Sequence, residues 1–127
     1  MKPLSDCTVA LLVSGGISHC SVAPFDPDAR NDHRVDAIDP AEATDQYQIH
    51  DSYYNHVDAD ADLNCIFPVD RLRELAEAGE IGAVAGRHWS GFMGRTYNRS
   101  KVRDESGPAL AAFLKADGVD LLVAIPA

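Results

Sequence analysis

Apolar residues in this chain gather into three short runs separated by polar segments. Thr8–Ser14, Ile81–Gly86 and Val119–Ile125 are almost continuously apolar, and each ends at a glycine or proline. Runs of this length without alternation are typical of strands that are buried on both faces, as in parallel sheets covered by helices. The sequence therefore predicts three strands in the interior of an α/β protein.

Two segments between these runs have helical periodicity. The first follows Pro68 and stops near Gly79, whereas the second carries an apolar stripe with Leu110 and Phe113 and stops at Gly118. Proline near the start and glycine just past the end are ordinary helix boundaries. The order strand, long loop, helix, strand, loop, helix, strand predicts a short parallel sheet flanked by helices, with right-handed crossovers. The expected fold is a three-layer, Rossmann- or flavodoxin-like half.

The segment from about residue 17 to 64 has no long periodic pattern and is rich in Pro, Asp and Asn, which favour turns. Its stretch from Asp26 to Asp62 holds eleven acidic residues and two arginines, which accounts for the whole net charge of −9. We therefore expect one α/β domain over residues 1–127 with a long, solvated acidic loop. A concentrated negative charge repels phosphate backbones, so nucleic acid is excluded as a partner.

The apolar runs are all far shorter than the ~20 residues that cross a bilayer. The N-terminus lacks the cleavage pattern of a signal peptide, so we expect a cytoplasmic protein without a membrane partner. The three cysteines, Cys7, Cys20 and Cys65, are far apart and form no Cys-x-x-Cys motif. They are predicted to be free thiols, with Cys7 and Cys65 buried as small apolar residues.

Ligands of parallel sheets bind outside the carboxyl ends of the strands. Two loops and one terminus follow the predicted strands, and we expect them to meet at one edge of the sheet. They are the segment around Ser14-Gly15-Gly16, the segment around His88-Trp89, and Pro126-Ala127. The candidate catalytic residues are His19, Cys20 and His88, and the candidate substrate-binding residues are Ser14, Gly15, Gly16 and Trp89.

Each candidate also has a structural interpretation. Ser14–Gly16 match the start of the phosphate loop of ATP pyrophosphatases, but Ser18 and His19 replace the aspartate and serine of that motif. The glycine pair then serves a strand-end turn. His88 is either a proton carrier in a glycine-rich loop or a packing residue. Cys20 is either a resolving thiol or an inert loop cysteine.

The acidic stretch Asp58–Leu63, with sequence DADADL, resembles the start of a calcium loop. Leu63 and Val69 stand where an EF-hand requires glycine and glutamate, so that motif fails. His50, His56 and the neighbouring aspartates form a third, metal-binding interpretation, although their spacing matches no established site. No metal ligand is assigned.

Several stretches together resemble the selenoprotein B family of glycine, sarcosine, betaine and D-proline reductases. The most specific are FPVDRLRELAEAGEIG at residues 67–82 and DGVDLLVAIPA at residues 117–127, and the similarity covers nearly the whole chain. The resemblance implies reductive cleavage of a carbon–nitrogen bond in a small amine or amino acid by a selenolate or thiolate. It also implies a partner subunit whose pyruvoyl group activates the substrate.

In that family the reactive selenium or sulfur follows the strand that matches Val119–Ile125, whereas this chain stops at Ala127. We therefore expect no cofactor within the chain, a selenocysteine or cysteine centre just after Ala127, and no activity of the chain alone. One interpretation is the N-terminal part of a longer reductase subunit, ended for instance by a UGA codon read as a stop. The alternative is a binding or assembly module without a redox centre, which self-associates or meets a partner through the open edge of its sheet.

Overall fold

A computed structural model describes residues 2–93 and 96–127 of the chain. The strands are β1 Thr8–Val13, β2 Ile17–His19, β3 Val35–Ile38, β4 Tyr47–Ile49, β5 Ala83–Val84, β6 His88–Gly91 and β7 Leu121–Ile125. The α-helices are α1 Val57–Ala61, α2 Val69–Glu77, α3 Arg99–Lys101 and α4 Gly107–Ala116. A π-helical turn, Val102–Ser106, joins α3 to α4, and 3-10 turns lie at Leu4–Asp6, Thr44–Gln46 and Leu63–Cys65.

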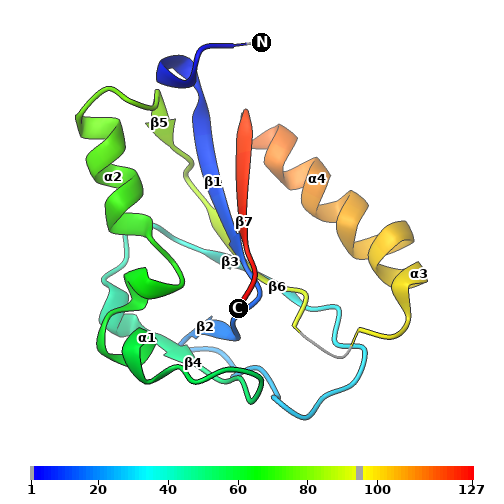
Figure 1. The fold of residues 1–127 in the computed structure, drawn as a ribbon. Helices are drawn as coiled ribbons and strands as arrows, with labels where there is room; N and C mark the ends of the chain where they lie inside the picture. The colour runs from blue at the N-terminus through cyan, green and yellow to red at the C-terminus, as the bar shows by residue number, and fades with distance from the viewer. Residues whose placement is uncertain (1, 94–95) are drawn as a thin grey trace.

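The main sheet is built around β1 (Figure 1). β5 and β6 lie parallel to β1 on one side, and β7 lies parallel to it on the other. β3 pairs with β6 in the antiparallel direction, so the sheet is mixed. The prediction of a small α/β fold with parallel strands flanked by helices is confirmed, with β3 as an unexpected antiparallel edge.

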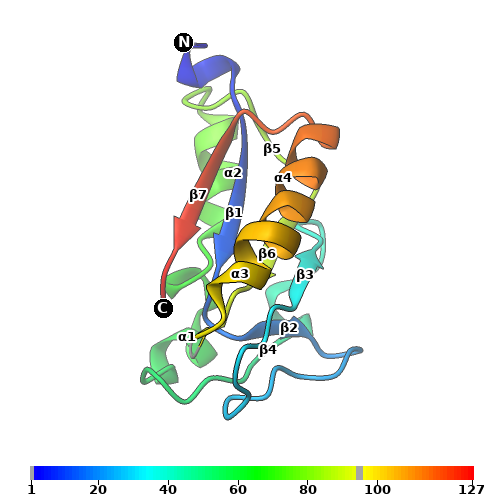
Figure 2. The same cartoon turned by 90° about the vertical axis from the view of Figure 1, so that its right-hand side faces the viewer.

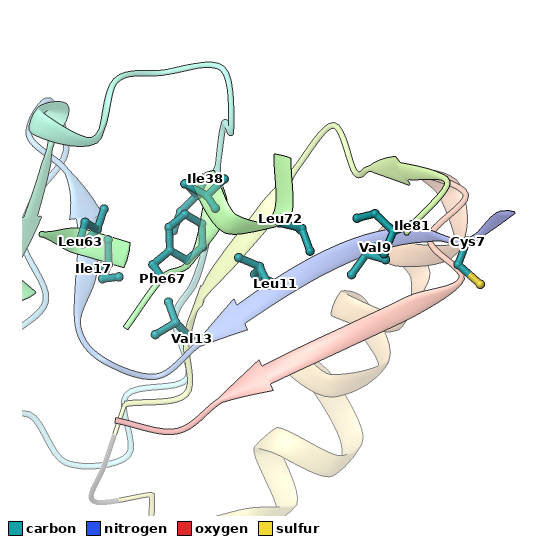
Figure 3. Packing of buried hydrophobic residues seen from close by; sticks show 11 residues of the cluster. Cys7, Val9, Leu11, Val13, Ile17, Ile38, Leu63, Phe67, Leu72 and Ile81 are labelled. Carbon is teal, nitrogen blue, oxygen red and sulfur yellow. The ribbon is translucent and has the colours of Figure 1, made fainter. Parts of the chain in front are cut away.

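Helices α2 and α4 cover opposite faces of this sheet. Neighbouring residues of β6 point to opposite faces: the His88 ring packs edge-on against Phe67 just before α2, and the Trp89 ring stacks on Phe113 of α4. Figure 2 shows α4 in front of β6, with β7 at the uncovered edge. Figure 3 shows the core on the α2 side, where Leu11 of β1 lies near Phe67 and Leu72.

The segment expected to be a loop contains regular structure. β2 and β4 form a two-stranded antiparallel ribbon, with Ile17 opposite Ile49. β3 adds a strand to the main sheet, and α1 occupies part of the acidic stretch that was expected to be a loop. These elements have three to five residues each, which is too few to establish a hydrophobic period in the sequence.

The second predicted strand is interrupted and then continues. Only Ala83–Val84 pair with the start of β1, whereas His88–Gly91 pair with its end and with β3. The expected glycine-rich loop after residue 86 therefore begins with a buried strand, His88–Gly91, and Gly94 of that loop lies outside the described residues. The two helix stops are confirmed, because Gly79 and Gly118 adopt φ values of 74° and 67°, which favour glycine.

Exposure of the cysteines differs in part from expectation. All three thiols are free; Cys7 is buried, as predicted, and Cys20 and Cys65 are exposed. The prediction for Cys65 is wrong, because within its 3-10 turn the side chain of Leu63 enters the core and that of Cys65 is exposed. Among the described residues, no helix is both long and apolar enough to cross a membrane.

Candidate functional site at the carboxyl edge of the sheet

The loop after β1 and the end of the chain lie side by side, as the topology predicted. The backbone N–H of Ser14 donates a hydrogen bond to the carbonyl oxygen of Ile125 at 3.2 Å. The Ser14 hydroxyl in turn accepts a hydrogen bond from the Ala127 N–H at 3.4 Å. Ser14 therefore fixes the direction in which the chain leaves β7.

A cleft of about 380 Å³ opens at this edge, where β1, β6 and β7 end. Its lining is mostly apolar and consists of Leu12, Ser14, Gly91, Phe92, Ala124, Ile125 and Pro126. Phe92 follows β6 with a φ of 54°, which is unusual for a bulky residue and typical of functional or tightly constrained sites. The geometry thus gives a small apolar recess with one hydroxyl at its rim.

The two glycines after Ser14 allow close approach of other segments. Gly16 has a φ of 69°, and a Cβ placed on it would stand 2.2 Å from the His50 carbonyl oxygen. A Cβ on Gly15 would stand 2.9 Å from the Tyr54 hydroxyl and 3.1 Å from the Ala127 Cβ. Tyr54 and the end of β7 therefore pack directly against the Gly15 backbone and form a cradle around it in which no side chain fits.

Tyr54 is a site residue that the sequence did not indicate. Its hydroxyl donates a hydrogen bond to the Gly15 carbonyl oxygen at 2.9 Å. Partial burial, with the negative charges of Asp51 and Asp60 adding to it, raises the pKa of Tyr54 to about 12. The phenol therefore keeps its proton at neutral pH and remains a hydrogen-bond donor at the edge. The only sequence signal was the group of aromatic residues around positions 53–54, which offered surface to pack.

His88 does not reach this edge. It is fully buried in β6, and its Nδ1 accepts a hydrogen bond from the Leu11 N–H at 3.1 Å. Burial, with a smaller contribution from the charge of Arg73, lowers the pKa of His88 to about 4. The neutral imidazole holds β6 to β1, so His88 lies in a strand and not in the expected glycine-rich loop.

Trp89 lies on the opposite face of the same strand. Its ring is 5.3 Å from that of Phe113, with an interplanar angle of 19°, and the Arg87 guanidinium lies 5.2 Å from its centre. Arg87 is held by two hydrogen bonds to Asp117, at 2.6 and 2.8 Å. Trp89 is therefore separate from the cleft, whose lining it does not join.

His19 and Cys20 lie at the end of β2 and do not line the cleft either. The His19 ring is 3.3 Å from the Glu42 carboxylate and 2.6 Å from the Ser21 hydroxyl, and packs edge-on against Tyr47. The Cys20 thiol is exposed. Of the seven residues predicted from the sequence, Ser14, Gly15 and Gly16 are brought together with the C-terminus, and His19, Cys20, His88 and Trp89 are not.

Metal ligation was the third interpretation of the sequence. Across the described residues, no three His, Cys, Asp or Glu side chains gather closely enough to hold a metal ion. His56 instead pairs with Asp60 within α1 and its N-terminus, with 2.8 Å between Nδ1 and the carboxylate.

Comparison with known proteins places the chain among reductase subunits. It is 37% identical over 122 residues to D-proline reductase subunit gamma of Acetoanaerobium sticklandii, which covers 96% of this chain and 49% of that protein. It is 29% identical over 135 residues to glycine reductase complex component B subunit gamma of Carboxydothermus hydrogenoformans, which covers 97% of this chain and 28% of that protein. The chain thus spans half or less of the length of these relatives. No solved structure matches it significantly.

A family model agrees with these two relatives and with the resemblance seen in the sequence. The model of glycine/sarcosine/betaine reductase selenoprotein B matches residues 1–125, which is nearly the whole chain. The chain therefore belongs to the glycine/sarcosine/betaine reductase selenoprotein B family.

Proposed function

We propose that these residues form the N-terminal half of a thiol- or selenol-dependent reductase subunit that cleaves a carbon–nitrogen bond in a small amine or amino acid. Family membership supports a reductase component, and the relative with 37% identity is named as a subunit of D-proline reductase. The observation that carries the proposal is the position of Ala127. It stands at the carboxyl edge of the sheet, beside Ser14 and the Gly15 cradle.

The proposal locates the reactive selenium or sulfur of the subunit at this edge of the sheet. The cradle around Gly15 is filled by the Tyr54 hydroxyl, the Ala127 Cβ and the Ile66 side chain. A selenolate or thiolate at the open edge beside it would supply the nucleophile for the reductive step. The Tyr54 hydroxyl donates its one proton to the Gly15 carbonyl oxygen and so holds the loop in place, and the apolar recess at this edge favours exclusion of water from a small substrate.

The chain's own residues have three roles in this proposal. Ser14 orients the exit of β7 through its hydrogen bond with the Ala127 N–H. Gly16 lets the His50 backbone close over the loop, because no side chain fits there. Tyr54 holds a proton at its hydroxyl beside the cradle. In this proposal the substrate is activated by a pyruvoyl group on a partner subunit.

The open edge of β7 supports the partner part of the proposal and also the alternative function. β7 pairs only with β1 among the described strands, and its Leu121 and Val123 are 42% and 39% exposed. Such an edge is stabilised by further chain, by a partner subunit or by self-association. The alternative function, a non-catalytic binding or assembly module, uses the same edge without a redox centre.

The test is substrate-dependent turnover. The native protein, purified with its partners from its own host, is assayed for dithiol oxidation with D-proline, glycine, sarcosine and betaine. We expect one of these to be reduced, and no turnover by the recombinant 127-residue chain alone. The reductase proposal is overturned if the native protein reduces none of the four. Turnover by the recombinant chain alone would overturn the placement of the reactive selenium or sulfur outside residues 1–127.

A further inference from the structure

A second cavity lies on the α4 side of the sheet. It is separate from the cleft at the carboxyl edge beside Ala127, which we call the Ala127 edge. The cavity has a volume of about 210 Å³, lies between β6, the start of β3 and α4, and is partly open to solvent. Carbon atoms dominate its lining, which includes Val35, Ala109, Leu110 and Phe113. Pockets for drug-sized ligands occupy about 300–1,000 Å³, so this cavity is sized for a smaller molecule.

Two side chains in this lining have polar atoms without partners. Trp89 is 3% exposed, and its indole N–H is buried with no acceptor among the described residues. Both ring nitrogens of His33 are also buried and unpaired within the described part of the chain. Buried polar groups in native proteins are almost always paired. Three orphaned nitrogens on the walls of one cavity therefore indicate that a bound molecule completes them.

The wall of this cavity is fixed before any ligand arrives. The Trp89 ring is stacked on Phe113, and Arg87 lies over both rings at 5.2 and 5.4 Å. Asp117 holds the Arg87 guanidinium by two hydrogen bonds. Phe113 covers one face of the indole ring, and Arg87 lies beside the stacked pair, so the ring is held in one orientation. A wall of this kind loses little conformational freedom on binding.

We propose that this cavity binds a small molecule in which a carbonyl group is attached to a short apolar chain, as in an amide or a carboxylate. The carbonyl oxygen accepts the Trp89 indole N–H, the His33 imidazole forms the second polar contact, and the hydrocarbon lies against Leu110 and Phe113. A bare hydrocarbon would leave the three nitrogens unpaired, and a strongly polar molecule would find few partners on the apolar walls. The proposal is independent of the reductase activity, because no residue of this cavity lines the Ala127 edge.

Trp89 is the single tryptophan of the chain, so its fluorescence reports on this cavity directly. The probes are butyramide, which is neutral, and butyrate, which is anionic. We expect at least one probe to shift the Trp89 emission saturably, with a Kd on the order of millimolar for a ligand of so few atoms. Saturation by butyramide alone identifies a neutral amide site, and saturation by butyrate alone a carboxylate site.

Two matched variants on α4 locate the binding. Ala109 lines the cavity, whereas Ala111 on the same helix does not, and both are exposed. Leucine is a good helix former, so Ala109→Leu fills the cavity without unfolding the helix. We expect Ala109→Leu to weaken binding at least about tenfold, a loss that filling a small pocket readily produces, and Ala111→Leu to leave it unchanged. Absence of a saturable signal with both probes, or equal binding by the two variants, would overturn the proposal.

Discussion

β1 and β7 are neighbouring parallel strands with the same apolar character and opposite environments. Val9 and Leu11 of β1 are each 1% exposed, whereas their register partners Leu121 and Val123 of β7 are 42% and 39% exposed. Paired residues of parallel strands point to the same face, so the difference does not come from orientation. The difference in exposure arises because α2 packs over β1 and β5. Among the described residues, β7 has no helix over this face and no strand on its far side (Figure 1). An exposed apolar edge strand of this kind indicates a surface that binds further protein.

The largest predicted effect is the difference between truncations in these two strands. Leu11→Ala removes a buried side chain in contact with the α2 core and should cost about 2–5 kcal/mol in the free energy of unfolding. Val123→Ala removes a side chain that is already well exposed and should cost about 1 kcal/mol or less. Urea unfolding of both variants measures the comparison. Similar losses would mean that β7 is already covered in solution.

The next largest predicted effect is on the pH dependence of stability and comes from His88, which accepts a hydrogen bond from β1. Its pKa is about 4 in the folded protein and 6.5 without burial. Below pH 6.5 His88 becomes protonated in the unfolded chain, whereas in the folded chain it stays neutral down to about pH 4. Stability present above pH 6.5 is therefore lost as the pH falls, by up to about 3 kcal/mol at pH 4.

The matched variant is His88→Asn, which retains an acceptor for the Leu11 N–H and does not titrate. We expect its unfolding free energy to fall less steeply between pH 6.5 and 4 than that of the wild type. Identical slopes for the wild type and His88→Asn would show that His88 is not buried in its neutral form.

The smallest predicted effect on stability, and the most informative on assembly, comes from making β7 more polar. Val123→Thr keeps the shape of the side chain and should change the unfolding free energy by no more than about 0.5 kcal/mol at this exposed position. It should lower self-association measured by sedimentation at micromolar concentration. Val22→Thr, at a similarly exposed valine outside the sheet, is the control. Equal association of both variants would argue against the β7 edge as the contact.

The sequence predicted the long elements and missed the short ones, for a physical reason. β1, β7, α2 and α4 are long enough for an apolar run or a helical period to be recognised, and glycine marks the ends of both helices. The β2–β4 ribbon has three residues in each strand, so its existence depends on pairing between segments about thirty residues apart. Local sequence carries little information about such pairing.

The candidate site divides in the same way. Ser14–Gly16 and Ala127 were predicted to meet because the carboxyl ends of parallel strands share one edge of a sheet, and they do meet. His88 was misplaced because the glycines around it indicate a loop, whereas the strand continues through it. Tyr54 was missed because its approach to Gly15 depends on the tertiary path of residues 50–56, which no local pattern specifies.

The central claim is that the Ala127 edge belongs to a larger redox subunit. The most direct measurement is the intact mass of the protein isolated from its native host, with selenium determined on the same sample. The account predicts a species well above the 13.7 kDa of this chain, containing either selenium or additional cysteines after residue 127. A native mass of 13.7 kDa without selenium would contradict it, and the binding or assembly module would then be the better account.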